Sequence, residues 1–224
     1  MLKNILFRVA KAPWMGKVVG RVFQYGSWLL PVKKLYLSKE TIAFPHPRPS
    51  YDNHLILSPR KAVPNLLAPS MDGKELMGIW KGMQSLRETE AGFQRCFTLV
   101  ANGGARQEVQ QLHFHLFTQP ALVRNRTGDL LNATVLCSSG QVQVWRLPEP
   151  QYELHFILQP VTSEMRDMDA ATFSKLLQCL HWLNNSFSLM QKGYSLIYPF
   201  DENNHESNHN VFHVIAGKRL PIQQ

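Results

Sequence analysis

The chain has 224 residues, enough to bury a substantial core as one domain or as two small, similar units. Hydrophobic residues make up 44% and charged residues 18%, which excludes a disordered chain and a coiled coil, and no continuous apolar run is long enough to span a membrane. The net charge of +8 lies in one segment, because 8 Lys and Arg residues precede the first acidic residue, Glu40, and the other 16 basic residues balance 16 acids.

Residues 1–40 form this basic N-terminal segment. Its apolar positions recur at helical spacing and predict two short amphipathic helices broken at Pro13. Packing against the body of the protein, with solvated lysines, is one interpretation. Peripheral contact with an anionic membrane surface is another, because each basic residue near such a surface contributes about 1 kcal/mol. A mitochondrial transit peptide is a third, since acid-free basic helices suit one.

Other features favour a cytoplasmic protein. Arg8 and Lys11 interrupt the first apolar stretch and spoil a signal-peptide core, so we expect the sequons at Asn125, Asn132 and Asn184 to be unused. The cysteines stand far apart without a CxxC pair, which argues against a disulfide scaffold and a Cys-based zinc site. They are Cys96, Cys137 and Cys179.

An internal repeat is visible next. Residues 41–59, TIAFPHPRPSYDNHLILSP, align without a gap on residues 142–160, VQVWRLPEPQYELHFILQP, at a spacing of 101. Matching pairs include Phe44–Trp145, Pro49–Pro150, Tyr51–Tyr152, Asp52–Glu153, His54–His155 and Pro59–Pro160. We therefore predict two tandem units, residues 41–118 and 142–219, with residues 119–141 holding a linker and the first strand of the second unit.

Each unit is predicted to contain one amphipathic helix. Apolar residues recur at helical spacing in both units, 97 residues apart. They are Leu76, Ile79, Trp80, Met83 and Leu86 in the first unit, and Phe173, Leu176, Leu177, Leu180 and Leu183 in the second. Ser70 and Asp72 offer N-cap chemistry ahead of the first helix, and Asp169 ahead of the second.

Strands follow each helix. Apolar strands are expected at residues 97–101 and 194–198, and final strands at residues 112–117 and 211–215. The order strand, strand, helix, strand, turn, strand leaves no room for repeated parallel crossovers. It predicts an α+β fold with an antiparallel sheet.

The final strand of the first unit carries the most chemistry. Alternation places Gln111, His113 and His115 on one face and apolar residues on the other. Two imidazoles about 7 Å apart along a strand suit a nucleophile with a supporting donor, or two metal ligands. Upstream lie Asn102 with two glycines and then Gln107, which completes the pattern NGGxxQxVxQxHxH, and HLILSP precedes it at residues 54–59.

This order of motifs resembles the histidine-triad (HIT) family, and the resemblance covers residues 41–118. The family pattern is a strand that ends in an Asn and a glycine-bearing turn, a Gln-x-Val step, and His-x-His-x-His followed by apolar residues. The resemblance implies a HIT-like antiparallel sheet with helices. It also implies that the middle His, here His113, attacks the α-phosphate of a nucleotide to form a nucleotidyl-imidazole intermediate, which is released to water or another acceptor.

The same resemblance assigns the other site residues. His113 suits attack because neutral imidazole is a good nucleophile near pH 7. His115 would donate to phosphate oxygens as charge develops, and Asn102 would orient the imidazole or a phosphate oxygen. Gln107 and His54 join Asn102 in the expected nucleotide-binding set, although the match of His54 to His155 in the second unit favours a structural role.

Two residues depart from the family pattern. Gln111 stands in the place of the first His, so a titrating group is lost there while a hydrogen bond remains available, and we keep it in the catalytic set. Glu108 stands where many members have a small hydroxyl residue. Its carboxylate would repel an anionic substrate unless it points away or pairs with Arg106.

The second unit is predicted to lack a nucleophile. Alignment of HESNHNVFHVI with QEVQQLHFHLF puts His213 under His115, His209 under Gln111 and Val211 under His113. An apolar valine cannot attack phosphate. We therefore expect one nucleophilic site per chain, with the second unit in the place of the partner subunit of HIT homodimers, as an intramolecular pseudodimer. The His-Pro-His motif of the uridylyltransferase relatives is absent.

Three classes of function are compatible with these motifs. The first is a nucleotidyl hydrolase or transferase that acts on a nucleoside phosphoester, phosphoramidate or dinucleotide. The second is a nucleotide-binding or sensing module without turnover. The third is a metal hydrolase that uses His113 and His115 with His54 or His46, but no well-spaced carboxylate accompanies them, so we expect no stoichiometric metal and no cofactor. Nucleic acid is not an expected partner, because the excess basic residues are confined to the N-terminal segment.

Overall fold

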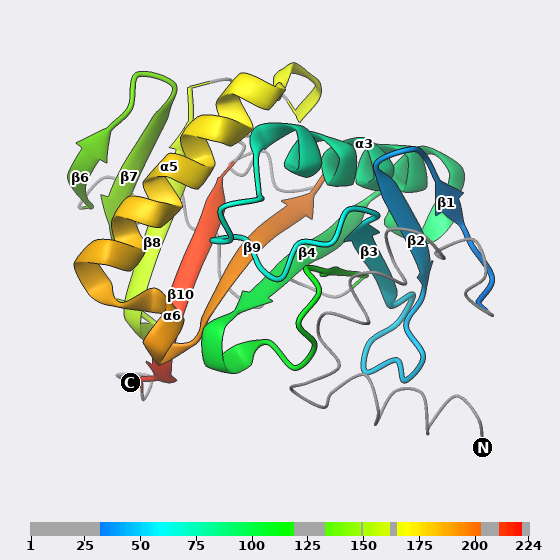
Figure 1. Cartoon of the computed structure of the whole chain (residues 1–224), viewed down its shortest axis with the longest axis horizontal. Coiled ribbons are helices and arrows are strands. Elements are labelled where there is room, and N and C mark those ends of the chain that lie inside the picture. Colours follow the sequence, from blue (N-terminus) through cyan, green and yellow to red (C-terminus); the bar gives the residue numbers. More distant parts are fainter. Residues whose placement is uncertain (1–31, 119–132, 149, 162–164, 203–210, 221–224) are drawn as a thin grey trace.

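The computed structural model describes residues 32–118, 133–148, 150–161, 165–202 and 211–220. In this part of the chain ten strands form one antiparallel sheet, with two long helices on it (Figure 1). The strands are β1 Tyr36–Leu37, β2 Thr41–Pro45, β3 Leu55–Pro59, β4 Cys96–Gly103, β5 Phe114–Phe117, β6 Thr134–Ser138, β7 Val142–Arg146, β8 Tyr152–Pro160, β9 Tyr194–Asp201 and β10 Phe212–Arg219. The helices are α3 Gly73–Thr89, α5 Ala170–Phe187 and the short α6 Leu189–Lys192, with 3₁₀ turns at Ala91–Phe93, Gly104–Arg106 and Met165–Asp167. The predicted α+β class is confirmed.

The strand order is β1-β2-β3-β5-β4-β9-β10-β8-β7-β6. All neighbouring strands pair antiparallel, and the two central strands, β4 and β9, pair from Cys96 opposite Asp201 to Gly103 opposite Tyr194. These strands are about a hundred residues apart in the chain. Their pairing therefore joins the early and late parts of the sequence in one continuous sheet.

Both predicted helices form where the apolar periodicity places them. Asp72 caps α3 by accepting hydrogen bonds from the backbone N–H groups of Lys74 and Glu75, and Asp169 caps α5 by accepting from that of Thr172. All members of the two predicted apolar stripes are buried. None of the described helices is long and apolar enough to cross a membrane.

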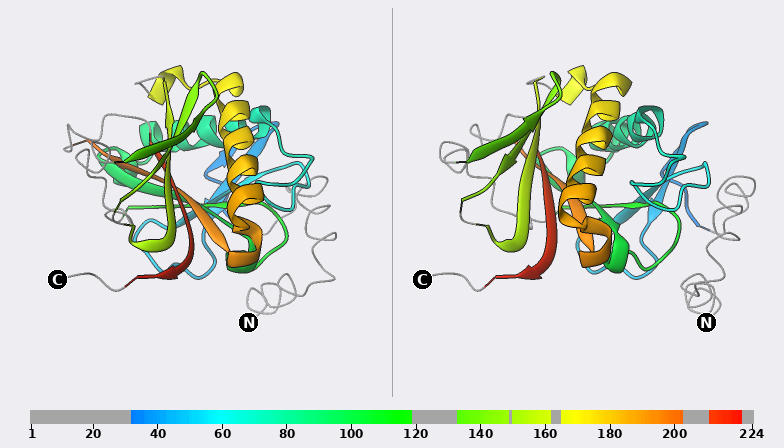
Figure 2. Two further views of the ribbon diagram at one scale, coloured as in Figure 1. Left: turned by 90° about the vertical axis from the view of Figure 1, so that its left-hand side faces the viewer. Right: turned by 60° about the vertical axis from the view of Figure 1, so that its left-hand side comes forward.

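The two faces of the sheet differ, because successive side chains of a strand point to opposite sides. On β4, Leu99 and Ala101 belong to the main core together with the helix residues, whereas Val100 belongs to a separate cluster on the other face. Figures 1 and 2 show α3 and α5 on the same side of the twisted sheet. The side opposite α3 and α5 carries smaller apolar clusters and the pocket described below.

The structure differs from the expected element boundaries at the start of the sheet and at the start of β5. The sheet begins at β1, inside the segment that we treated as separate, and the predicted helices around Pro13 lie outside the described residues. Strand β6 falls within residues 119–141. Strand β5 begins only at Phe114, because the backbone N–H of Leu112 donates to the carbonyl of Val63 in a loop, 2.6 Å away, instead of continuing the ladder.

Candidate active site

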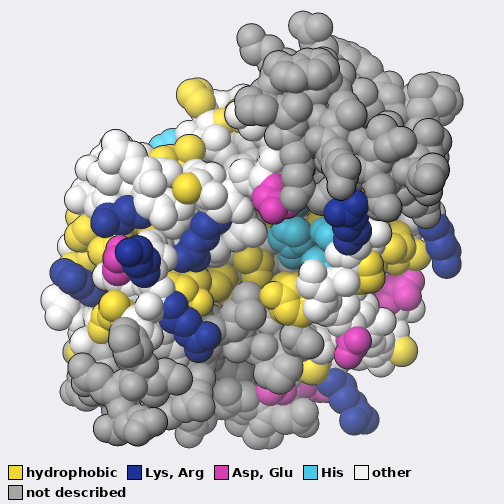
Figure 3. Space-filling model, turned by 90° about the horizontal axis from the view of Figure 1, so that it is seen from below, with side chains coloured by type: hydrophobic (Ala, Val, Ile, Leu, Met, Phe, Trp, Pro, Cys, Tyr) yellow, Lys and Arg dark blue, Asp and Glu magenta, His cyan; other side chains and the backbone are white. Residues whose placement is uncertain are grey.

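A pocket of about 680 Å³ opens on the face of the sheet opposite α3 and α5. Its walls come from β2, β3, β5 and β4 and, across the central strand pair, from β9, β10 and β8. Figure 3, which views the molecule of Figure 1 from below, shows histidine side chains gathered together at the surface. All six predicted site residues line the pocket: His54, Asn102, Gln107, Gln111, His113 and His115.

His113 lies directly before β5 and is held through one ring nitrogen. Its Nδ1 is 2.8 Å from the backbone carbonyl oxygen of Gln111. Because a carbonyl can only accept, Nδ1 carries the proton, and the neutral ring has its lone pair on Nε2. Burial lowers the pKa of His113 from its ordinary value, although the Gln111 carbonyl and the nearby Glu108 carboxylate oppose this effect. The ring is therefore neutral at pH 7.

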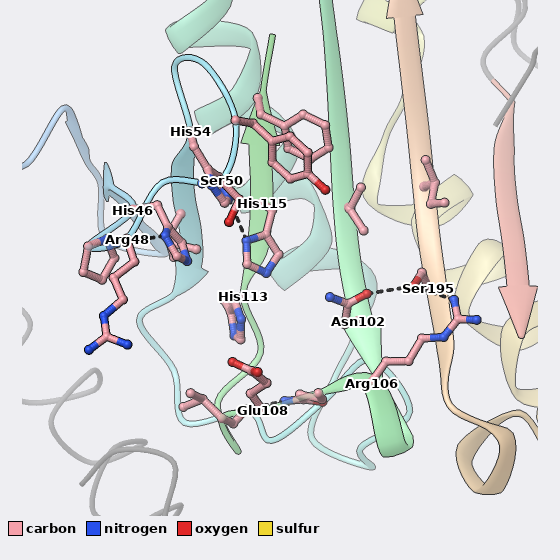
Figure 4. Close-up of a pocket in the computed structure, with 18 of the residues that line it drawn as sticks. His46, Arg48, Ser50, His54, Asn102, Arg106, Glu108, His113, His115 and Ser195 are labelled. Atoms are coloured by element: carbon pink, nitrogen blue, oxygen red, sulfur yellow. Dashed lines mark hydrogen bonds between the residues drawn. The ribbon is translucent and has the colours of Figure 1, made fainter. Parts of the chain in front are cut away.

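His54 and His115 form a hydrogen-bonded pair whose tautomers follow from their neighbours. The backbone N–H of Ser50 donates to Nδ1 of His54 over 3.3 Å, so neutral His54 carries its proton on Nε2. That Nε2 lies 2.9 Å from Nδ1 of His115 and donates to it. Neutral His115 therefore carries its own proton on Nε2. Figure 4 shows this ring directed into the pocket from β5.

A third imidazole completes this histidine group. His46 stacks on His54 with ring centroids 4.1 Å apart and planes within 3°. Burial, followed by repulsion from the neighbouring imidazoles, lowers the pKa of His54 to about 4 and that of His115 to about 3, and burial also lowers the pKa of His46. Ring nitrogens of His46, His54 and His115 lie within 4.8 Å of one another, so among the described residues these three have the spacing of metal ligands, and His113 does not belong to the group.

The two glutamines of the motif, Gln107 and Gln111, donate their side-chain N–H groups to backbone carbonyls and not to the cavity. Gln111 is buried, and its amide nitrogen donates to the carbonyls of Pro59 and Lys61 over 3.1 and 3.0 Å. The amide nitrogen of Gln107 donates to the carbonyls of Val109 and Pro64. Both side chains thus tie the loop before His113 to the segment after β3. The side-chain atoms that they could still offer to a ligand are their amide oxygens, which only accept hydrogen bonds.

Asn102, at the end of β4, is the predicted residue with its donors toward the site. The hydroxyl of Ser195 on β9 donates to Oδ1 of Asn102 over 2.7 Å. Figure 4 shows the amide nitrogen of Asn102 on the opposite side, toward His113. A guanidinium N–H of Arg106 donates in turn to the Ser195 hydroxyl over 3.1 Å.

Charged side chains flank the histidines. The Glu108 carboxylate lies beside His113 in Figure 4, and it raises the pKa of His113 against the effect of burial. Arg48 lines the pocket next to His46. The sequence motif did not identify three residues that line the pocket: Arg48, Tyr51 and Ser195. For Arg48 and Tyr51 the signal in the sequence was their place in the proline-rich part of the repeated segment, and for Ser195 there was none.

The corresponding face of the late strands contains a second histidine pair without a nucleophile. Nε2 of His155 lies 3.0 Å from Nδ1 of His213, which repeats the geometry of His54 and His115. Val211, in the position that aligns with His113, is 3% exposed and packs with Leu147 and Ile157. In the alignment of the repeat, Leu147 stands where the first segment has His46. His209 lies outside the described residues.

Fold and pocket together define an α+β protein with a HIT-like antiparallel sheet and a pocket that contains several neutral imidazoles. Residues 30–121 match the family model of the HIT domain. This match extends beyond residues 41–118 at both ends and includes β1. No curated protein sequence matches the chain.

Solved structures with a similar fold span most of the chain. A GalT-like protein from Arabidopsis thaliana is 10% identical with a TM-score of 0.60, and the similarity covers 86% of this chain and 80% of that one. An ADP-glucose phosphorylase from Arabidopsis thaliana, solved with bound ADP-glucose, is 10% identical with a TM-score of 0.63, covering 91% and 82%. A yeast Ap4A phosphorylase in complex with AMP is 12% identical with a TM-score of 0.55, covering 90% and 64%. At these identities the similarity establishes a common fold.

Proposed function

We propose that this chain binds a nucleotide and transfers its nucleotidyl group, to water or to another acceptor, through a covalent intermediate on His113. The observation that carries this proposal is the state of His113: the Gln111 carbonyl fixes the proton on Nδ1 and leaves a lone pair on Nε2 in the pocket. A neutral, oriented imidazole is the form that can attack phosphorus. Proteins of similar fold bind ADP-glucose, AMP or Ap4A, which supports a nucleotide as the ligand.

The reaction would proceed in two displacements. In the first, Nε2 of His113 forms a bond to the α-phosphorus while the bond from phosphorus to the leaving group breaks, and the leaving group takes a proton from solvent or from a pocket donor. In the second, water or an acceptor hydroxyl or amine loses a proton and attacks the same phosphorus. The phosphorus–nitrogen bond then breaks and returns His113 to its neutral form. Two easier steps replace one difficult displacement.

Two side chains would stabilise the negative charge on the phosphate oxygens. His115 presents an N–H on Nε2 because Nδ1 accepts from His54, and Asn102 presents its amide N–H₂ because Oδ1 accepts from Ser195. Both donors are preorganised by partly buried hydrogen bonds, so they need not reorient as the transition state forms. Gln107 and Gln111 would act indirectly, since their donors hold the loop before His113.

The proposal includes an organisation in two HIT-like units, residues 41–118 and 142–219, that form an intramolecular pseudodimer. The strand order supports it, because reading outward from the central pair gives β4, β5, β3, β2 and β1 on one side and β9, β10, β8, β7 and β6 on the other. The matching pairs His54–His115 and His155–His213 support it as well. Only the first unit would be catalytic, since the second unit has Val211 at the position that aligns with His113.

A binding or sensing module without turnover is the second candidate. The observation that favours it is Glu108, whose carboxylate lies beside His113 where an anionic phosphate would bind. In this case the pocket would still hold a nucleotide through Asn102 and His115. No covalent adduct would accumulate.

The decisive experiment is intact-mass spectrometry after incubation with a panel of nucleotide conjugates, including ADP-glucose, Ap4A and an adenosine phosphoramidate. We expect a nucleotidyl adduct on His113, and His113→Ala should lose it together with at least about a thousandfold of turnover, as expected for removal of a nucleophile. His181→Ala, which removes a histidine of α5 outside the pocket, is the control. Nucleotide binding without adduct or turnover would establish the second candidate, and an adduct on another residue would overturn the mechanism.

A further inference from the structure

A residue from the late part of the chain, Ser195, contacts the candidate active site by a hydrogen bond to Asn102. Asn102 of β4 and Ser195 of β9 lie opposite each other in the central strand pair. The Ser195 hydroxyl donates to Oδ1 of Asn102 over 2.7 Å, and Ser195 itself is 5% exposed. A residue from the second predicted unit therefore holds the amide of the first.

Arg106 determines which way this hydrogen bond runs. Its guanidinium is a donor only, and it donates to Ser195 Oγ over 3.1 Å and to the carbonyl of Gly217 on β10 over 2.6 Å. With its oxygen accepting from Arg106, Ser195 has its proton left for Asn102, and the amide oxygen is the atom that can accept it. All three groups are satisfied when the oxygen of Asn102 faces Ser195 and the nitrogen faces His113.

The position of Arg106 is itself set by packing against the late strands. It ends the 3₁₀ turn Gly104–Arg106, and its guanidinium lies 5.4 Å from the centre of the Tyr152 ring. Gly193, just before β9, has a φ of +71° and approaches so closely that a Cβ there would contact Arg106 and Ala105. This packing leaves the guanidinium little freedom to turn away from Ser195.

We propose that Ser195 and Arg106 are positioning residues that hold the Asn102 amide with its two donors toward the nucleotide phosphate. This inference rests on the proposed function. Without the Ser195 hydroxyl the amide can rotate by half a turn, and its oxygen would then face the anionic phosphate. The second unit thus completes the active site of the first, and its contribution is orientation of a donor across the central strand pair.

A double-variant cycle on Ser195 and Asn102 tests the proposal, with the affinity for AMP and kcat/KM for an adenosine 5′-tryptamine phosphoramidate as readouts. We expect Ser195→Ala and Asn102→Ala each to lower kcat/KM by about tenfold to a hundredfold, the effect of one hydrogen bond to a charged group. In the Asn102→Ala background, Ser195→Ala should add less than about twofold, because the amide that it orients is gone. Ser195→Thr keeps the hydroxyl and should retain activity, and Ser174→Ala on α5 controls for loss of a partly buried, hydrogen-bonded hydroxyl.

A second readout does not depend on turnover. The side-chain amide resonances of Asn102, identified by their absence in Asn102→Ala, should shift in Ser195→Ala and in Ser195→Cys, whose thiol is a weak donor, but not in Ser174→Ala. If the Asn102 resonances respond to these variants but the chain neither binds AMP nor turns over substrate, the proposed function is wrong. The positioning role of Ser195 would then still hold. A chain that turns over with multiplicative variant effects, or with resonances indifferent to Ser195, would overturn the positioning role alone.

Discussion

At the scale of single residues, the pocket is a set of imidazoles kept neutral by burial. Burial disfavours the charged form of each ring and lowers the pKa values of His54, His115 and His113, and repulsion between neighbouring histidines lowers those of His54 and His115 further. Neutrality decides the chemistry, because only a neutral ring offers a lone pair for attack and a single N–H for donation. The backbone groups of Ser50 and Gln111 then decide which nitrogen does which.

Glu108 is the residue whose charge opposes this arrangement, and we expect Glu108→Gln to tighten AMP binding by about five- to twentyfold at low salt. The carboxylate near His113 repels phosphate, and the isosteric amide does not. The gain should shrink as salt rises, since salt screens the repulsion. Calorimetric titration of AMP measures both effects.

Glu88→Gln is the matched control, because it removes one negative charge from an exposed position of α3 outside this pocket. Its AMP affinity should stay within about twofold of the unaltered chain. Unchanged or weaker AMP binding by Glu108→Gln would show that Glu108 does not repel the ligand and contributes a contact instead.

At the scale of elements, the turn that follows β4 and leads toward β5 is shaped by contacts with the late part of the chain. Gly104 opens this 3₁₀ turn with a φ of +59°, and the turn packs on α6. A Cβ at Gly104 would overlap the carbonyl of Met190. The glycine pair after Asn102 thus meets two requirements at Gly104: a left-handed backbone conformation and a close approach to another element.

Gly104→Ala and Gly140→Ala separate these two requirements. Both positions have positive φ, and alanine there costs about 1 kcal/mol of strain, but a Cβ at Gly140 has nothing within 4 Å. We expect Gly140→Ala to lower the free energy of unfolding by about 1 kcal/mol and Gly104→Ala by about 2–4 kcal/mol, since overpacking adds its own cost. Urea denaturation measures both, and equal losses would show that α6 yields to the added methyl group.

At the scale of the whole molecule, one sheet passes through both predicted units and carries a histidine pair in each. The central β4–β9 pairing spans eight residues on each strand, and it brings Ser195 to Asn102. The helices seal the other face with a single core that contains residues of α3 and α5. The fold therefore places the pocket beside the central strand pair, where the early and late strands of the chain meet.

The buried histidine pairs predict that stability falls in acid. Burial lowers the pKa of His155 to about 4 and that of His213 to about 3, so folding keeps both neutral and unfolding takes up protons below about pH 6.5. Each proton makes the free energy of unfolding fall by about 1.4 kcal/mol per pH unit between pH 6.5 and the lowered pKa. Urea midpoints at pH 7 and pH 5 should show this decrease.

The double variant His155→Leu/His213→Val removes one of the two histidine pairs. It should reduce the slope of the free energy of unfolding against pH without abolishing it, because His54 and His115 remain. A slope identical to that of the unaltered chain would mean that the second pair is already protonated, or exposed, near neutral pH.

The local elements were predictable because their signals lie within a few residues. The apolar stripes from Leu76 and from Phe173, and the caps Asp72 and Asp169, identified both helices, since a helix buries residues three and four apart and a carboxylate satisfies its first N–H groups. The start of β5 was not predictable at the same accuracy, because Leu112 pairs with the distant carbonyl of Val63.

The sequence by itself determined the α+β class, the histidine motif and the similarity of residues 41–59 to residues 142–160, all of which depend on spacing along the chain. Tertiary structure decided what these residues can do: the proton positions on His113, His54 and His115, the use of the Gln111 donors by backbone, and the arrival of Ser195 beside Asn102. The physical reason is that a hydrogen bond depends on direction and distance between groups that can be 93 residues apart, as Ser195 and Asn102 are.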